Sequence, residues 1–266
     1  MKELCLWAAG AFGMQWYAVC HFVPVLTADL DTWAALSLVG TSAATSFVSA
    51  SFGLGGGAIL LAVMALLLPP AALIPVHGVV QLGSNAGRTA LLLPHVFRAA
   101  VPAFAAGSVL GAVVGGAISV ELPGAALQML VGLFVLFTVV ARAPGWLTGA
   151  PAVTGMITSF LTMFVGASGL FVAGYSRALN LPKLGYVATH AALMTLQHGL
   201  KVAVFAALGF AFSDWLLLAL AMMAAGLIGT WAGRALLIKA DEKLFRRALD
   251  VLLVALSLRL IWQSVT

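Results

Sequence analysis

Two short glycine-rich stretches interrupt the apolar segments, one in each half of the chain. Residues 53–57 read GLGGG, and residues 166–169 read GASG. Where a helix resumes after such a break, its first N–H groups lack partners within the helix, and the positive end of the helix dipole lies at the same terminus. Both features favour binding of an anion there. A close helix crossing that requires small side chains is the alternative. The predicted backbone contacts to the anion are Gly55, Gly56, Gly57, Ser168 and Gly169.

Polar residues follow each break at spacings of three and four, which places them on one face of a helix. Such a face within a membrane normally lines the bundle interior or a water-filled path. We expect the amides, with Ser84 and His198, to orient an anion and the two cations to attract it. Snorkelling to the headgroups is the alternative for the cations, and an interhelical hydrogen bond is the alternative for the histidines. The first set is His77, Gln81, Ser84, Asn85 and Arg88, and the second is His190, Gln197, His198 and Lys201.

No acidic residue lies deep inside a predicted span, because every Asp and Glu lies in a loop or near a span end. A carboxylate proton relay or a sodium cage is therefore not expected. A site that combines cations, amides and N–H groups without a fixed anion selects for anions. If protons are coupled to binding, His77 and His190 are the candidate carriers. No metal and no cofactor are predicted.

The composition places these residues in a membrane. Of the 266 residues, 63% are hydrophobic and 8% are charged, against roughly 45–50% and about 25% in soluble domains. This excludes a cytosolic enzyme. The apolar runs are continuous rather than alternating, which indicates helices and not barrel strands. The runs cover residues 4–26, 34–52, 57–68, 72–93, 99–119, 123–141, 148–167, 170–180, 185–207, 213–235 and 246–263.

The net charge of +5 indicates topology rather than nucleic-acid binding, because the basic residues lie singly or in short loops beside the apolar runs. The first run, 4–26, is interpreted as a membrane span rather than a signal peptide, since no clear cleavage site follows it. It holds the only two cysteines, Cys5 and Cys20. Neither lies at metal-ligand spacing from a histidine or carboxylate, and two cysteines exclude a disulfide scaffold.

The two halves of the sequence resemble one another. A shift of 113 residues carries Gly53 to Gly166, Pro69 to Pro182, and the histidine and cation of the first polar set to those of the second. After an insertion, Gly111-x-x-x-Gly115 matches Gly229-x-x-x-Gly233, pairs of small residues that permit close helix approach. We predict an N-terminal span over residues 1–30, a first repeat over 31–142 and a second repeat over 143–266.

Charge distribution predicts that the two repeats have opposite orientations. The loop after the run 213–235 is basic, which predicts a cytoplasmic location, whereas its counterpart near residue 120 carries only Glu121. If 34–52 and 57–68 form a re-entrant hairpin, each repeat crosses the membrane three times, and inversion requires an odd number. The predicted fold is an all-α polytopic membrane protein with two inverted-topology repeats and broken hairpins. Its N-terminus is cytoplasmic and its C-terminus periplasmic.

These features resemble the sulfite exporter TauE/SafE family. The likeness rests on the stretch from Phe52 to Gly57, the proline a dozen positions later, the polar helix from His77 to Arg88 and a degenerate second copy, and it covers about residues 34–263. Thiosulfate-importing relatives rely on core cysteines, which the two repeats here lack. The second break also has Leu170 where the first has a third glycine. Each break with its polar set is a half-site, and the two half-sites are expected to be unequal.

The resemblance implies a bacterial inner-membrane secondary transporter, not an enzyme, that moves sulfite or a sulfonate such as sulfoacetate by alternating access. Import of other small organic acid anions is an alternative. Two non-transport alternatives are a rhomboid-like intramembrane protease, with Ser168 activated by His190 or His198, and an accessory membrane subunit. The expected partners are a small anion and the lipid bilayer, with a homodimer kept open and no nucleic acid. Substitution of Asn85 or Gln197 by alanine is expected to abolish binding without affecting folding.

Overall fold

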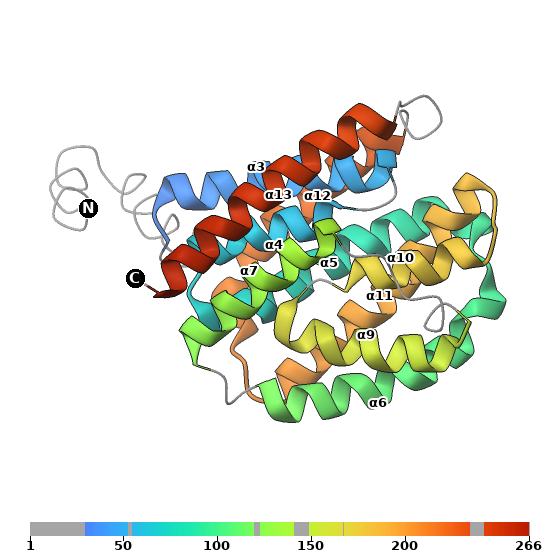
Figure 1. The fold of residues 1–266 in the computed structure, drawn as a ribbon, viewed down its shortest axis with the longest axis horizontal. Helices are drawn as coiled ribbons and strands as arrows, with labels where there is room; N and C mark the ends of the chain where they lie inside the picture. The colour runs from blue at the N-terminus through green and yellow to red at the C-terminus, as the bar shows by residue number, and fades with distance from the viewer. Residues whose placement is uncertain are drawn as a thin grey trace, which may run out of the picture.

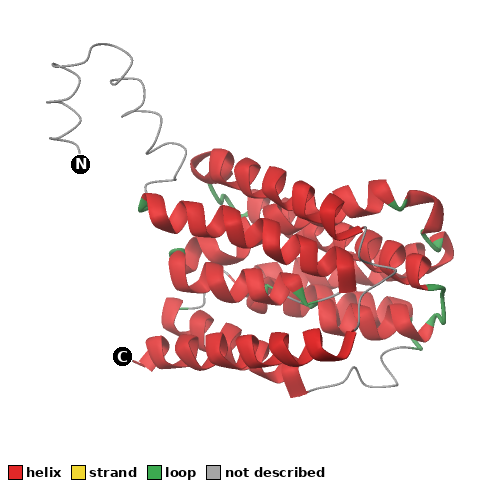
Figure 2. Cartoon of the chain, turned by 90° about the horizontal axis from the view of Figure 1, so that it is seen from above, coloured by secondary structure: helices red, strands yellow, loops and turns green. Residues whose placement is uncertain are grey.

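The computed structural model describes residues 30–52, 55–119, 123–140, 149–166, 168–234 and 242–265, and within these ranges it contains helices and no strands (Figure 2). The predicted N-terminal span and both cysteines lie outside the described residues. Each helix begins or ends near a Gly, Pro or polar residue that bounds an apolar run. The α-helices are α3 (Thr32–Phe52), α4 (Gly56–Leu67), α5 (Pro70–Leu91), α6 (Val101–Ser119), α7 (Gly124–Val140), α9 (Pro151–Val165), α10 (Gly169–Ala178), α11 (Lys183–Ala207), α12 (Leu216–Arg234) and α13 (Glu242–Val265).

The all-α membrane fold is confirmed. Three helical segments, Thr32–Phe52, Arg98–Ile118 and Phe212–Arg234, are long and apolar enough to cross a membrane. Helices α5 and α11, with 22 and 25 residues, are also long enough, but their polar faces lower their mean hydropathy and they are not among these three segments. The two helices that follow the breaks, α4 and α10, have 12 and 10 residues, and a helix needs about 20 residues to cross the apolar core of a bilayer.

The helix pairing is symmetric between the two halves of the chain: each pair has a counterpart, or pairs equivalent helices. The first helix of each hairpin packs on the fourth helix of the other half: α3 lies along α12, and α9 lies along α6. The remaining equivalent helices pair with each other, α5 with α11 and α7 with α13. In Figure 1, α3, α12 and α13 form one side, α6 and α9 form the opposite side, and α5, α10 and α11 lie between them.

The predicted close approach at the two glycine pairs is confirmed. A Cβ atom on Gly111 would overlap the carbonyl oxygen of Met156 on α9, and one on Gly229 would overlap that of Ala43 on α3. Both contacts are to backbone, which cannot move aside as a flexible side chain can. Glycine is therefore required at both crossings, because only its missing side chain lets the two backbones meet.

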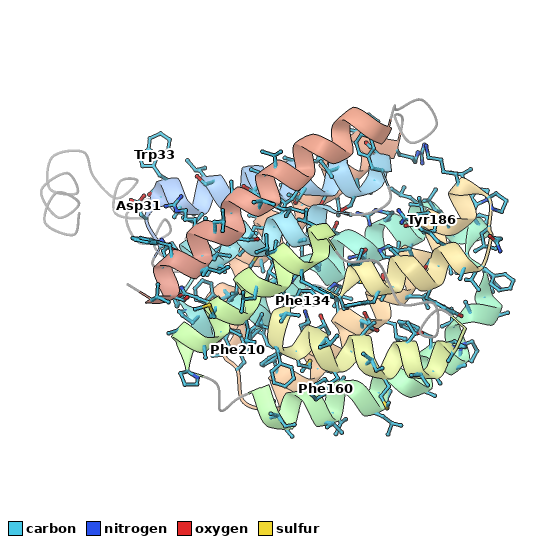
Figure 3. All side chains as sticks on the ribbon, viewed as in Figure 1. Asp31, Trp33, Phe134, Phe160, Tyr186 and Phe210 are labelled. Carbon is cyan, nitrogen blue, oxygen red and sulfur yellow. The ribbon has the colours of Figure 1, made fainter. Side chains whose placement is uncertain are left out.

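The outward faces of the bundle are apolar. Trp33 projects away from the start of α3 (Figure 3), and on α12 the side chains of Ile228 and Trp231 are each 68% exposed. The buried residues, in contrast, include many serines, threonines and the polar sets of α5 and α11. This inversion of the soluble pattern fits a chain that presents apolar residues to lipid and keeps polar groups inside.

Candidate functional site

Both glycine-rich stretches interrupt the helices as predicted. The first break separates α3 from α4, and Gly55 has a φ of +100°; the second separates α9 from α10, and Gly166 has a φ of +71°. L side chains rarely adopt such angles, which explains glycine at these two positions. Gly56 is also enclosed, because a Cβ there would overlap the carbonyl oxygen of Thr45 on α3. Gly55 and Gly166 thus each lie at the edge of a break in a conformation that favours glycine.

The two breaks meet where α5 crosses α11. Lys201 on α11 donates a hydrogen bond from Nζ to the carbonyl oxygen of Gly166, at 2.9 Å. His77 on α5 lies with Nε2 3.1 Å from the carbonyl oxygen of Gly57. The crossing is close, since a Cβ on Gly78 would lie 2.9 Å from Cδ of Lys201. One cation and one histidine, drawn from different halves of the sequence, therefore each anchor one break.

Lys201 and Arg88 do not snorkel. Lys201 is fully buried and Arg88 is 4% exposed, so the alternative of headgroup contacts is wrong for this structure. The two helices that hold these cations, α5 and α11, contain no Asp or Glu. Two buried cations without a carboxylate on the helices that hold them produce a positive potential in the interior.

One member of the second polar set, Gln197, is the centre of a hydrogen-bonded cluster. The hydroxyl of Ser168 donates to Oε1 of Gln197 at 2.9 Å, and Nε2 of Gln197 donates to the hydroxyl of Ser159 at 2.9 Å and to that of Thr158. All of these residues are fully buried. The proposed Ser–His dyad is wrong for this structure, because Ser168 is bonded to an amide oxygen and not to His190 or His198.

The first polar set forms a chain along α5. The side-chain amide of Asn85 donates to the backbone oxygen of Gln81 at 2.8 Å and to its Oε1 at 3.1 Å. Arg88 donates to Oδ1 of Asn85 at 3.2 Å and to the hydroxyl of Ser84 at 3.5 Å. Ser84 in turn lies 2.9 Å from the hydroxyl of Ser46 on α3. The amides orient the guanidinium, and Nε of Arg88 has no hydrogen-bond partner.

The histidines lie beside the cations. The rings of His77 and His198 meet edge to face, with centroids 5.9 Å apart. Nδ1 of His77, His190 and His198 is buried and has no hydrogen-bond partner. The alternative of an interhelical hydrogen bond holds for His77, whose Nε2 contacts the Gly57 carbonyl of α4, while the second nitrogen of this ring has no partner. Among the described residues, no three His, Cys, Asp or Glu side chains gather as metal ligands would.

The structure brings together the predicted residues of each half, and it adds hydroxyl groups that the sequence analysis did not single out. Ser46, Thr158 and Ser159 belong to α3 and α9, the helices before the breaks. The internal repeat contained the signal that would have found them, since the shift of 113 residues carries Ser46 to Ser159 and Ser84 to Gln197. The hydrogen-bonded pair 46/84 thus recurs as the pair 159/197. Gly169 begins α10, where a Cβ would meet only Met194 at 3.9 Å.

Comparison with known proteins gives one result. The profile of the family described as sulfite exporter TauE/SafE matches residues 38–260. This range contains both breaks and both polar sets. No curated protein and no solved structure gives a significant match.

Proposed function

The chain belongs to the sulfite exporter TauE/SafE family and is a multi-pass membrane protein; from this premise we propose that it carries a small sulfur-containing oxyanion across the bacterial inner membrane. The proposed substrates are sulfite and sulfonates such as sulfoacetate. The proposed mechanism is alternating access, in which the two repeats move against each other around one central site.

One observation carries this proposal. The breaks of the two halves converge at the crossing of α5 and α11, where Lys201 holds the Gly166 carbonyl and His77 the Gly57 carbonyl. No carboxylate lies on either helix. A buried ammonium is costly unless it is paired, and a carbonyl oxygen compensates only part of that cost. An arriving anion supplies the missing negative charge, which is the basis for selecting anions over neutral solutes and cations.

The polar sets supply the other contacts of the proposed site. Their hydrogen bonds are mostly made within each half, and several of these side chains are almost inaccessible to solvent. Binding therefore exchanges internal hydrogen bonds for bonds to the oxyanion. We assign orientation of the anion to Gln81, Asn85 and His198, and N–H contacts to the residues that open α4 and α10.

Coupling to protons is assigned to His77 and His190. Each ring is buried and keeps one nitrogen without a partner, so each can accept a proton when water enters its side of the bundle. Since no acidic residue lies on α5 or α11, a histidine is the group on these helices suited to carry a proton with the anion.

The experiment is flux of [³⁵S]sulfite into proteoliposomes that contain the purified chain. We expect uptake that saturates with concentration, responds to an imposed pH gradient and is inhibited by a sulfonate. Asn85→Ala is the matched variant, because its side-chain bonds are confined to α5. It should lower flux at least roughly 10-fold, as loss of one hydrogen bond to a charged group does. The free energy of unfolding in detergent should fall by about 1 kcal/mol, because the buried Arg88 loses its bond to Oδ1 of Asn85.

The same flux assay tests the alternative functions. Uptake of a small carboxylate with no uptake of any sulfur anion would assign the chain to organic acid transport. No flux across a panel of both classes would contradict transport and favour an accessory subunit. Wild-type flux by Asn85→Ala would show that the site is misplaced.

A further inference from the structure

We propose that His77 takes up one proton together with each anion and acts as a positioning residue for Lys201. In its doubly protonated form the ring donates to the carbonyl oxygens of both breaks, Gly57 and Gly166. The Gly166 carbonyl is also the acceptor of Lys201, so the proton on His77 releases the ammonium for the anion. This inference rests on the proposed function and adds to it the number of protons coupled and the way in which they are coupled.

The contact with the first break fixes the hydrogen of the neutral ring. Nε2 of His77 lies 3.1 Å from the carbonyl oxygen of Gly57, and a carbonyl oxygen only accepts hydrogen bonds. The hydrogen therefore lies on Nε2, and Nδ1 is the nitrogen that takes up a second proton. Nδ1 is buried and has no hydrogen-bond partner. A proton there creates a buried donor, which requires an acceptor.

The second break supplies that acceptor. Gly166 packs against α5 one turn before His77, because a Cβ on Gly166 would lie 3.2 Å from Cδ1 of Ile74. Immediately after His77, a Cβ on Gly78 would lie 2.9 Å from Cδ of Lys201. The ring also interacts with the Gly166 carbonyl, although Nδ1 does not bond to it in this arrangement. The ring and the ammonium are thus neighbours of the same carbonyl oxygen.

Among the described residues, two titratable groups face the ring of His77, and both lie on α11. Lys201 is its charged neighbour, and the ring of His198 meets it edge to face at 5.9 Å. The other elements that pack most closely on α5 are α3, α4, α7, α9, α12 and η3 (Phe212–Trp215). Helices α3, α4, α7 and α9 contain no titratable side chain, and the charged residues of η3 and α12, Asp214 and Arg234, are exposed.

These charges make binding of the proton and binding of the anion cooperative. A second positive charge beside Lys201 is unfavourable in a buried site, and a bound anion compensates it. In return, protonation of His77 occupies the Gly166 carbonyl and frees the ammonium to donate to the anion. The proton reaches Nδ1 from the water that enters with the anion, so no further reactant is needed. Each ligand therefore raises the affinity for the other, as linkage requires.

Proton uptake on anion binding tests the inference. Sodium sulfate, which does not titrate near neutral pH, is added to the purified full chain in weakly buffered detergent with a pH-indicator dye, and bound [³⁵S]sulfate is measured by scintillation proximity. We expect uptake of about one proton per bound anion, because a single nitrogen receives it. The affinity for sulfate should rise by up to about 10-fold for each unit that the pH falls. Binding without proton uptake would overturn the inference.

Three variants identify the residue that takes up the proton. Glutamine places an N–H near the position of Nε2 but takes up no proton, so His77→Gln should keep the contact with Gly57 and bind sulfate without proton uptake. His198→Gln should retain the wild-type uptake per bound anion. His95→Gln is the matched control, because His95 is exposed, and it should behave as the wild type. Wild-type uptake in His77→Gln, or loss of uptake in His198→Gln alone, would overturn the assignment to His77.

Failure of this inference is distinguishable from failure of the proposed function. Sulfite flux in proteoliposomes together with anion binding that takes up no proton removes the role of His77 alone. Absence of binding and of flux for every anion of the panel removes the proposed function and this inference with it.

Discussion

The two repeats use equivalent positions for different purposes. In the second repeat, Gln197 joins three hydroxyl groups, and all of them are buried and bonded. In the first repeat the equivalent position is Ser84, which makes a smaller set of bonds, and Nε of the neighbouring Arg88 has no hydrogen-bond partner. The difference lies in the hydrogen bonds: the second half closes them around one amide, whereas the first half leaves one nitrogen of its arginine without a partner.

The cations differ in the same way. Lys201 is fully buried and donates to the carbonyl of the break in its own repeat. Arg88 donates to the side chains of Asn85 and Ser84 on its own helix and lines a small pocket. Lysine is a compact charge that a single carbonyl can hold, while arginine has a planar set of donors that can serve two partners at once.

The largest effect that tests this comparison is expected for Gln197→Ala. The substitution leaves the hydroxyls of Thr158, Ser159 and Ser168 without their shared partner and creates a cavity. The free energy of unfolding should fall by about 3 kcal/mol, against about 1 kcal/mol for Ser84→Ala, as measured by chemical or thermal unfolding in detergent. This revises the sequence-based expectation that Gln197→Ala would leave folding intact. Equal losses in the two variants would remove the distinction between the half-sites.

The next effect concerns the central cation. Lys201→Met keeps the length of the side chain and removes its charge, so proteoliposome flux of sulfite should fall about 100-fold, because the charge-assisted contacts and the attraction of the anion are both lost. Stability should be unchanged or higher, since a buried charge is replaced by an apolar chain. Arg88→Met is the matched variant and should lower flux about 10-fold. If Arg88→Met were the more damaging, the roles of the two cations would be reversed.

The glycine crossings should respond alike, because both rely on contact with a backbone carbonyl. Gly111→Ala and Gly229→Ala should each lower the free energy of unfolding by about 2 kcal/mol as the added methyl group forces the helices apart. Gly40→Ala on α3 is the control, since nothing lies within 4 Å of its Cβ position. Alanine is a better helix former than glycine, so this variant should be more stable by up to about 1 kcal/mol. A large difference between Gly111→Ala and Gly229→Ala would show that the repeats are not equivalent in packing.

The smallest effect is expected for Gln81→Met. The second repeat has Met194 at the equivalent position, so this variant makes the first half-site resemble the second. Only the bond from Asn85 to Oε1 of Gln81 is lost, because Asn85 also donates to the backbone oxygen. The KM for sulfite should rise a few-fold with little change in maximal flux or in stability. A loss as large as that of Lys201→Met would place Gln81 at the centre of binding.

Much of the fold could be predicted from the sequence, because apolar runs, prolines and glycines act locally. The runs 57–68 and 170–180 correspond to α4 and α10, and the GLGGG and GASG stretches correspond to the two breaks. The polar faces of α5 and α11 followed from spacing alone. The predicted site roles of these residues stay predictions, whereas their burial together is an observation. Spacing alone could not decide whether Lys201 reaches the headgroups or the bundle interior, because its distance from the end of its helix allowed both.

The sequence by itself determined the class of the protein, the positions of its helices and breaks, and the absence of acidic residues from the helices that hold Arg88 and Lys201. Only the tertiary structure decided that α3 packs on α12 and α9 on α6, that Lys201 reaches Gly166, and that Thr230 and Arg234 join Arg88. The physical reason is range. Helix formation depends on neighbours within a few residues, whereas these contacts join residues that are far apart in the chain and depend on how whole helix surfaces fit together.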